Sequence, residues 1–271
     1  MDNAIMSAAS LHRTLPALPG QHSRPVSRSK TRLVRCSNER QVLFDRIAPV
    51  YDNLNDLLTV GQHRIWKRMA ISWSGAKKGD NVLDVCCGTG DLAFLLSEKV
   101  GPTGKVVGLD FSKQQLLIAS SRQHSQSKTC YENIKWIEGN AIDLPFPESS
   151  FDAVTIGYGL RNVVDRLKVL EEVCRVLKPG SKVSALDFNK STNPFSTSFQ
   201  EWMIDYVVVP AADIYGLANE YRYLKRSINE FLTGKELERL ALNAGFCSAK
   251  HFETGGGLMG NLVAVRYGYI P

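Results

Sequence analysis

Short apolar runs recur along the chain and alternate with segments whose apolar residues repeat at helical spacing. The runs that predict β-strands are 81–85, 105–110, 134–138, 151–156, 182–187, 246–253 and 261–267. The segments that predict α-helices between them are 91–99, 112–123, 166–177 and 233–244. This alternation predicts an α/β domain with a doubly wound, mostly parallel sheet and helices on both faces.

Two further helical segments fall outside the alternation, at 43–74 before the first strand and at 195–209 after the fifth. The second carries an apolar stripe at helical spacing, formed by Phe195, Phe199, Trp202, Met203, Tyr206 and Val207. Such a stripe usually packs into the core of a protein, and that is the first expectation here. A lid over an apolar substrate, or contact with a membrane surface, is the alternative. No apolar run reaches the ~18 residues that a membrane-spanning helix needs.

The positive charge of the chain is concentrated at its N-terminus. The 271 residues carry a formal net charge of +6, and the first 36 contain six Lys or Arg against one acidic residue. The rest of the chain is therefore nearly neutral. Because nucleic-acid binding relies on positive charge across the folded surface, we expect no nucleic-acid partner.

Residues 1–36 have the composition of a targeting segment. They are rich in Ser and Arg, poor in acidic residues and free of a secretory apolar block. Three prolines and Gly20 oppose the amphipathic helix of a mitochondrial leader, and the sequence around Cys36 resembles a plastid processing site. We therefore predict a chloroplast transit peptide, with a disordered basic tail as the alternative.

The cysteines give no sign of a metal site. None of the six forms a C-x-x-C pair or a zinc-binding spacing, and Cys86 and Cys87 are adjacent. We expect all of them to be reduced and predict that the protein needs no metal.

A glycine-containing loop closes the first predicted strand. Gly88-Thr89-Gly90 follows the apolar run, and glycines let the backbone approach a ligand without a Cβ clash. A dinucleotide-binding fingerprint expects a third glycine three residues later, where this chain has Ala93. The loop therefore points to a different nucleoside cofactor.

Polar side chains stand at the ends of the first three predicted strands. Asp84 can order the loop and meet a cationic amino group, while Asp110 can accept hydrogen bonds from both ribose hydroxyls. Asn140-Ala141 follows the third strand and can meet the edge of an adenine. This arrangement resembles class I S-adenosylmethionine-dependent methyltransferases. The resemblance implies S-adenosylmethionine as cofactor and a Rossmann-like sheet with an antiparallel last strand.

Further motifs narrow the resemblance to the C-methyltransferases of ubiquinone and menaquinone biosynthesis. These motifs are Tyr51-Asp52-Asn53-Leu54-Asn55 with His63 and Trp66, Leu144-Pro145-Phe146, Gly159-Leu160-Arg161-Asn162, and Arg175-Val176-Leu177-Lys178-Pro179-Gly180. Together they cover about residues 41–268. Leu54 and Thr59 stand where the family has Met and Ser. Asp187 stands where it has Glu, so the role of that carboxylate is open.

The resemblance implies methylation of a ring carbon of a lipid quinol, with peripheral membrane contact. Combined with the plastid-type leader, it implies a phytylated naphthoquinol as acceptor. The alternatives are a mitochondrial polyprenyl-benzoquinol C-methyltransferase, a small-molecule O-methyltransferase of the same fold, and a cofactor-binding scaffold without turnover. The methyltransferase domain would span 37–271, with an N-terminal helical segment at 41–74 and a helical insertion at 193–230.

The implied chemistry points to residues near the fourth strand and in the N-terminal segment. A quinol loses a hydroxyl proton as its ring carbon attacks, so a base or an anion-stabilising donor is expected. Arg161 can hold the quinolate oxygen or position a water that acts as base, and a structural ion pair is the alternative. His63 and Tyr51 are further catalytic candidates, although His63 can equally be a packed histidine. The remaining candidates are Asn162 and Tyr158 for the substrate and Gly157 for the cofactor.

Overall fold

The computed structural model describes residues 61–126 and 128–268. The predicted transit peptide, Tyr51 and the part of the N-terminal helical segment before Gly61 lie outside the described residues. The predictions made for them stay predictions.

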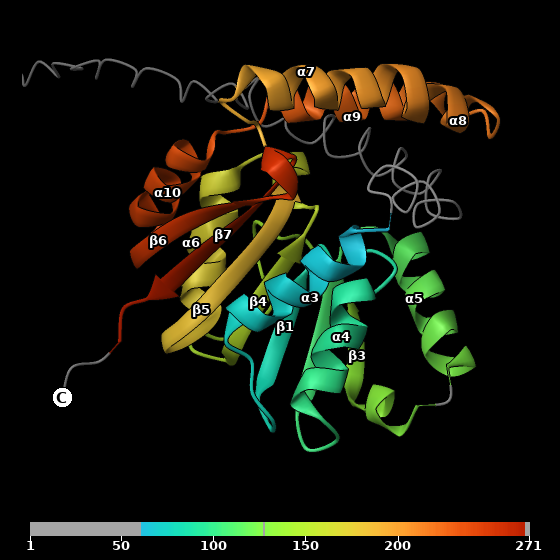
Figure 1. Cartoon of the computed structure of the whole chain (residues 1–271). Coiled ribbons are helices and arrows are strands. Elements are labelled where there is room, and N and C mark those ends of the chain that lie inside the picture. Colours follow the sequence, from blue (N-terminus) through green and yellow to red (C-terminus); the bar gives the residue numbers. More distant parts are fainter. Residues whose placement is uncertain (1–60, 127, 269–271) are drawn as a thin grey trace, which may run out of the picture.

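Seven strands form one sheet within the described residues, in the order β3-β2-β1-β4-β5-β7-β6 (Figure 1). They are β1 (Asn81–Val85), β2 (Lys105–Asp110), β3 (Ile134–Glu138), β4 (Phe151–Gly157), β5 (Leu177–Phe188), β6 (Phe246–Thr254) and β7 (Met259–Arg266). The first five are parallel, and β7 runs antiparallel to both of its neighbours. This sheet confirms the predicted fold, including its antiparallel last strand.

The strand order places a binding crevice beside β1. Neighbours β2 and β4 flank β1 and run parallel to it, but the chain reaches them in opposite directions across the sheet. In doubly wound sheets, ligands bind at the carboxyl ends of the strands where the order reverses in this way. The loops after β1, β2 and β4 therefore converge on one edge.

Helices cover both faces of the sheet. On one face lie α3 (His63–Ser74) and α4 (Asp91–Val100), and on the other α6 (Arg166–Val176) and α10 (Gly234–Asn243). The remaining helix of the alternating region, α5 (Lys113–Ser125), begins where Ser112 accepts a hydrogen bond from the Gln115 N–H at 3.1 Å. That cap follows the predicted helix start, because a serine at this position satisfies an otherwise unbonded amide.

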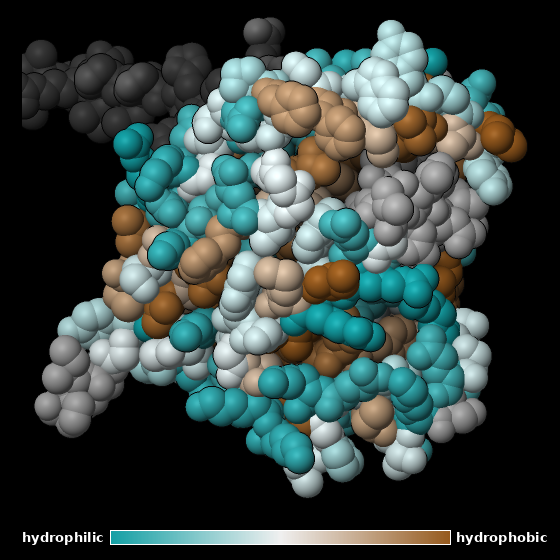
Figure 2. Space-filling view, in the orientation of Figure 1, coloured by the Kyte–Doolittle hydropathy of each residue, from teal (hydrophilic) through white to brown (hydrophobic). Residues whose placement is uncertain are grey.

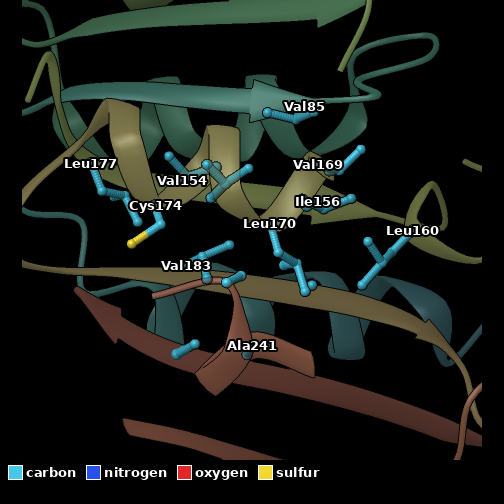
Figure 3. Close-up of a cluster of buried hydrophobic side chains, with 14 of the residues drawn as sticks. Val85, Val154, Ile156, Leu160, Val169, Leu170, Cys174, Leu177, Val183 and Ala241 are labelled. Carbon is cyan, nitrogen blue, oxygen red and sulfur yellow. The ribbon is translucent and has the colours of Figure 1, made fainter. Parts of the chain in front are cut away.

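The core on the α6 face is built from β-branched and leucine side chains (Figure 3). Val154 and Ile156 of β4 are fully buried against Val169, Leu170 and Val173 of α6. Their alternation with Ala153 and Thr155, which face the opposite side, is the two-residue period of a strand buried on both faces. The core thus fixes the position of β4 and of the loop that follows it.

The start of β5 differs from the prediction. It begins at Leu177 rather than at residue 182, and its pairing jumps from Phe151–Leu177 to Ala153–Lys182. The intervening Lys178-Pro179-Gly180-Ser181 forms a bulge, and Gly180 adopts φ 78° there. The turn-forming residues Lys178-Pro179-Gly180 are therefore part of the strand.

A helical insertion follows β5. It comprises α7 (Pro194–Met203), a π-helical turn (Ile204–Val208), α8 (Val209–Asp213) and α9 (Ala218–Asn229). Pro210 has no N–H to donate to the carbonyl four residues earlier, which explains why the regular helix is interrupted here. Ile204 and Val208 pack with Trp66 of α3 and Phe188 of β5. The insertion thus lies beyond the carboxyl end of the sheet (Figure 1).

The expectation that the apolar stripe packs into the core is wrong for most of its members. Phe195, Phe199, Trp202 and Tyr206 are all exposed, and apolar atoms reach the surface along the α7–α8 edge (Figure 2). Periodicity identifies one face of a helix, but it does not determine whether that face points to the protein or away from it.

Candidate active site

The loop after β1 is tightly packed at one glycine and has open space beside another. Cys86, Gly88 and Gly90 have positive φ values of 57°, 54° and 92°. A Cβ on Gly90 would lie 2.5 Å from Trp136 Cη2, whereas a Cβ on Gly88 would meet nothing closer than Gln115 Oε1 at 3.7 Å. Gly90 is therefore required for packing, and Gly88 leaves room for a ligand beside the backbone.

Asp110 holds this loop from the end of β2. Its Oδ2 accepts a hydrogen bond from the Gly88 N–H at 2.8 Å, and its Oδ1 accepts one from the Ser112 N–H at 2.9 Å. These two bonds hold Asp110 beside Gly88, where it is predicted to meet a ribose.

Asp84 is a fully buried carboxylate beneath the same loop. Its Oδ1 accepts a hydrogen bond from the Thr155 hydroxyl of β4 at 2.6 Å, while its Oδ2 is buried with no side-chain partner among the described residues. Burial raises the pKa of Asp84 to about 7, against the lowering effects of Thr155 and of the Ala93 backbone at the start of α4. A carboxylate in this state would be stabilised by a positively charged ligand.

Asp91, the first residue of α4, provides a second carboxylate beside the loop and links the loop to two other helices. It pairs with Lys67 of α3 and with Arg122 of α5, whose Nη2 lies 2.7 Å from Asp91 Oδ1. Although burial raises the pKa of Asp91, Lys67 and Arg122 outweigh it and bring the value to about 2. Arg122 also donates to the carbonyl and the hydroxyl of Thr89, each at 2.9 Å. This network fixes the loop, and sequence reasoning missed it.

Lys67 extends the network to the end of β4. Lys67 is buried, with its side chain 6% exposed, and its ammonium lies 5.8 Å from the centroid of the Tyr158 ring. Tyr158 itself has φ 58°, an uncommon conformation for a residue with a bulky side chain. Strained residues of this kind cluster at functional sites.

The loops after β1 and β4 touch each other. A Cβ on Gly159 would collide with the Cys86 side chain, and one on Gly157 would lie 2.6 Å from Leu92 Cδ1. The structure thus gives Gly157, which we assigned to the cofactor, a packing reason to be glycine. Contact between the two loops places Tyr158 beside the loop after β1.

Arg161 forms a buried ion pair with Asp187, and each side chain is 5% exposed. The Arg161 N–H also donates to Asp187 Oδ2 at 3.0 Å, and its Nη1 donates to the Tyr158 carbonyl at 2.9 Å. Asp187, whose role the sequence left open, therefore has a defined partner. The structural ion pair considered for Arg161 is present in the structure.

Asn162 joins the end of β4 to the helical insertion. Its Nδ2 donates to the Tyr158 carbonyl at 3.0 Å, and its Oδ1 accepts from the Tyr223 hydroxyl of α9 at 3.2 Å. The candidates Tyr158, Arg161 and Asn162 thus form one hydrogen-bonded group at the carboxyl edge of the sheet.

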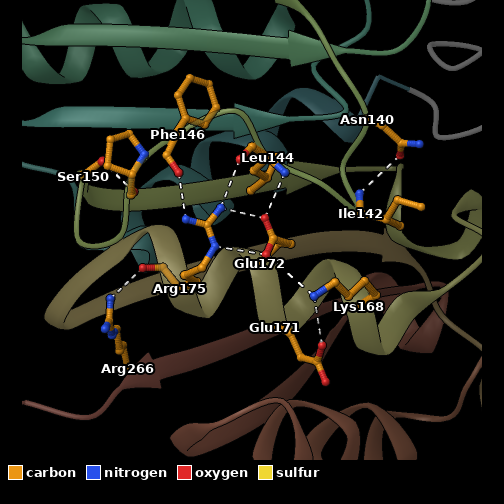
Figure 4. Close-up of polar contacts among 11 residues, drawn as sticks. Asn140, Ile142, Leu144, Phe146, Ser150, Lys168, Glu171, Glu172, Arg175 and Arg266 are labelled. Carbon is orange, nitrogen blue, oxygen red and sulfur yellow. Dashed lines mark hydrogen bonds and ion pairs between the residues drawn. The ribbon is translucent and has the colours of Figure 1, made fainter.

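The other candidates lie in different surroundings. His63 is buried as the first residue of α3. Asn140 is exposed, and its Oδ1 accepts from the Ile142 N–H at 3.2 Å in a local turn (Figure 4). Ala141 belongs to the core cluster on the α6 face. Tyr51 lies outside the described residues.

Two motifs of the family resemblance meet away from the site. Arg175 of α6 donates to the carbonyls of Phe146 and Leu144 at 2.7 and 3.0 Å, and Glu172 accepts from the Leu144 N–H at 2.9 Å (Figure 4). The Leu144-Pro145-Phe146 segment is therefore held against α6 by a charged pair. These motifs support the scaffold rather than the chemistry.

The described residues contain no group of three or more His, Cys, Asp or Glu side chains that could hold a metal ion. The loop at 86–90 is instead flanked by the carboxylates of Asp84, Asp91 and Asp110. Burial raises the pKa of the Cys86 and Cys87 thiols, and the charges of Asp110 and Asp84 raise it further. Local negative charge of this kind suits a cofactor that carries a sulfonium and an ammonium group.

None of the helices within residues 61–126 and 128–268 is both long and apolar enough to span a bilayer.

A model of the ubiE/COQ5 methyltransferase family matches residues 34–266. The chain is 69% identical over 249 residues to the 2-phytyl-1,4-beta-naphthoquinone methyltransferase, chloroplastic, of Arabidopsis thaliana, which covers 91% of this chain and 95% of the relative. It is 51% identical over 227 residues to a 2-phytyl-1,4-naphtoquinone methyltransferase of Nostoc sp., covering 84% and 98%.

Solved structures share the fold at much lower sequence identity. A SAM dependent methyltransferase from Aquifex aeolicus superposes with a TM-score of 0.57 at 19% identity, covering 79% of this chain and 97% of that one. A SAM-dependent methyltransferase from Thermotoga maritima, described as a possible histamine N-methyltransferase, gives 0.56 at 18% identity, covering 83% and 98%.

The buried state of Asp84 predicts opposite effects on stability and cofactor binding. Between about pH 4 and pH 7 the folded chain retains a proton that the unfolded chain releases, so the free energy of unfolding falls as pH rises through this range. Asp84→Asn removes that penalty. We expect the variant to melt at a higher temperature than the parent at pH 8, with a difference that shrinks toward pH 4.

The same variant should bind S-adenosylmethionine about tenfold more weakly at pH 8, since a charged hydrogen bond is worth about 1.5–3 kcal/mol. Calorimetry measures the affinity and thermal melting the stability, with the exposed Asp213→Asn as control. A variant that loses stability and keeps its affinity would contradict this role of Asp84.

The Lys67–Asp91–Arg122 network predicts that Lys67→Met weakens both the fold and the cofactor site. Removing one partner leaves a buried carboxylate less compensated, and we expect a loss of about 1–3 kcal/mol, less than for an isolated buried pair because Arg122 remains. Cofactor affinity should fall because α3 no longer holds the loop. Urea unfolding and calorimetry test this, with Arg68→Met on the exposed side of α3 as control; equal behaviour of the two variants would refute it.

Proposed function

Because the chain belongs to the ubiE/COQ5 methyltransferase family, we propose that it transfers the methyl group of S-adenosylmethionine to a ring carbon of reduced 2-phytyl-1,4-naphthoquinone. Membership makes it an S-adenosylmethionine-dependent methyltransferase. The substrate rests on one observation, the 69% identity over nearly the full length of the chloroplastic Arabidopsis relative. Methylation of that ring carbon yields the phylloquinone (vitamin K1) skeleton.

Methylation of a ring carbon requires the reduced form of the acceptor. A quinone ring is electron-poor, whereas a quinol that loses a hydroxyl proton pushes electron density onto the neighbouring ring carbon. A phenol-like hydroxyl has a pKa near 10, so at neutral pH a site that stabilises the anion gains rate. Bound S-adenosylmethionine supplies an electrophilic methyl group on a positively charged sulfur.

One group of residues is proposed to hold the cofactor, and another to position the acceptor. Asp84, Gly88 and Asp110 surround the space for the cofactor with backbone and carboxylates. The ion pair with Asp187 holds the Arg161 guanidinium in place, and we propose that Arg161 orients the quinolate oxygen or a water beside it. An arginine remains protonated, so it acts as a donor and not as the base.

The N-terminal segment supplies the remaining proposed contacts. His63 begins α3, the helix that Lys67 ties to the cofactor loop. We propose that His63, together with Tyr51, closes the site from this side, and that Asn140 and Ala141 lie beside the adenine. Asn162 and Tyr158 are proposed to face the acceptor because they share the hydrogen-bonded group of Arg161.

The proposed place of action is the plastid. The Arabidopsis relative is described as chloroplastic, and residues 1–36 have the composition of a transit peptide. Since a phytyl tail is insoluble in water, the substrate would be taken from a membrane. We propose peripheral contact with that membrane.

The reaction is tested with the full chain, S-adenosylmethionine labelled in its methyl group, and the reduced or oxidised acceptor. We expect label on a ring carbon with the quinol and none with the quinone, as read by NMR of the product. Label on oxygen would make the chain an O-methyltransferase, and binding of the cofactor without transfer to either acceptor would make it a scaffold.

Arg161→Lys tests the positioning role. Lysine keeps the charge opposite Asp187 but lacks the planar guanidinium that can serve two acceptors at once. We expect kcat to fall about 10–100-fold with little change in cofactor affinity. Thermal melting serves as the folding control. Equal losses in kcat and in cofactor affinity would show that Arg161 serves only the fold.

A further inference from the structure

The outer face of α7 and of the π-helical turn that follows carries a row of exposed aromatic side chains. Phe195 is 79% exposed, Phe199 42%, Trp202 51% and Tyr206 72%. Their spacing of three or four residues places them on one side of the helix. We call these four residues the aromatic ridge. Ile214 and Tyr215, beyond the end of α8, are also largely exposed.

Neighbouring rings of the ridge are close to one another. The ring centroids of Phe199 and Trp202 are 6.2 Å apart, and those of Trp202 and Tyr206 are 6.4 Å apart. Single exposed apolar residues are ordinary, but a contiguous group of this kind marks an interaction surface. Apolar atoms of the α7–α8 edge are visible at the surface in Figure 2.

The inner face of α7 shows that this orientation is built in. The Ser196 hydroxyl donates to the Gly256 carbonyl at 2.8 Å, and Gln200 Nε2 donates to the Leu258 carbonyl at 3.4 Å. Both polar side chains are buried. The helix thus turns small and polar residues toward the protein and aromatic residues outward, the reverse of a helix that faces water.

The charged residues of the segment that carries the ridge indicate whether an anionic or an uncharged membrane suits it. Between Pro194 and Pro210 the chain has no Lys or Arg and two acidic residues, Glu201 and Asp205. Asp205 lies 2.6 Å from the Lys225 ammonium of α9. Attraction to anionic lipid relies on basic residues, and the segment that carries the ridge has none between Pro194 and Pro210. Phe, Trp and Tyr side chains instead suit the interfacial region of an uncharged bilayer, where an apolar ring and a polar edge are both satisfied.

The ridge is connected to the site through the insertion that carries it. Ile204 and Val208, on the inner side of the same segment, share a buried cluster with Tyr158 and Phe188. Tyr223 of α9 donates to Asn162. The segment that carries the aromatic ridge therefore packs in the same buried cluster as Tyr158 of the candidate site.

We propose that the aromatic ridge adsorbs to the interfacial region of an uncharged lipid bilayer and holds the site next to the membrane that contains the acceptor. The inference deepens the proposed function, since it rests on an acceptor with a lipid tail. Adsorption relies on apolar contact, so it should persist at high salt and need no anionic lipid.

Flotation of the full chain with phosphatidylcholine vesicles tests this, at low and high salt and without substrate. The double variant Phe199→Ser/Trp202→Ser should reduce the bound fraction, with a partition coefficient about tenfold lower. The control is Leu117→Ser/Tyr267→Ser, which removes two exposed apolar side chains elsewhere and should leave flotation unchanged. Thermal melting verifies that both variants fold.

Three results would overturn the proposal. The ridge variant could float with vesicles as well as the parent does, or binding could require phosphatidylserine and disappear in high salt. Sedimentation could also show that the parent is a dimer and the ridge variant a monomer, which would make a second copy the occupant of the ridge.

Activity on a tail-less, water-soluble naphthoquinol separates this inference from the proposed function. If the inference is right, the ridge variant keeps that activity and loses activity on vesicle-borne acceptor. If only the proposed function fails, neither acceptor is methylated while flotation still depends on the ridge.

Discussion

The structure depends on keeping three carboxylates around the loop that joins β1 to α4, two from the ends of neighbouring strands and one from the first residue of the helix. Asp84, Asp91 and Asp110 surround one short loop, and each is stabilised differently. Lys67 and Arg122 pair with Asp91, backbone N–H groups bond Asp110, and burial raises the pKa of Asp84 to about 7. The first two arrangements fix the loop. The third leaves a buried acid that a cationic ligand can stabilise, which connects the electrostatics of the fold to its function.

Much of the fold was predictable because its signals are local. Strands with continuous apolar runs and helices with caps such as Ser112 form where the sequence indicates, and residues that follow successive parallel strands must meet at one edge. The Lys67–Asp91–Arg122 network was not predictable, because the side of α3 that faces α4 is set by packing between distant segments. The ridge at Phe199 and Trp202 was misassigned for the same reason.

Family motifs and site residues are only partly the same. Arg175 holds the Leu144-Pro145-Phe146 segment against α6, while Arg161 and Asn162 belong to the candidate site at the end of β4. Arg161 shows how the two roles combine, because its ion pair with Asp187 is buried and structural yet places a cation beside Tyr158. The candidate site at the edge of the sheet and the outward aromatic surface on the neighbouring insertion are consistent with the proposed lipid acceptor.

The central claim is that a buried carboxylate receives the positive charge of the cofactor, and proton release on binding measures it directly. Titration of S-adenosylmethionine into the full chain at pH 7, in two buffers of different ionisation enthalpy, gives the number of protons released. Because the pKa of Asp84 is about 7, the parent should release about half a proton more than Asp84→Asn. Equal proton release by the two chains would contradict the account.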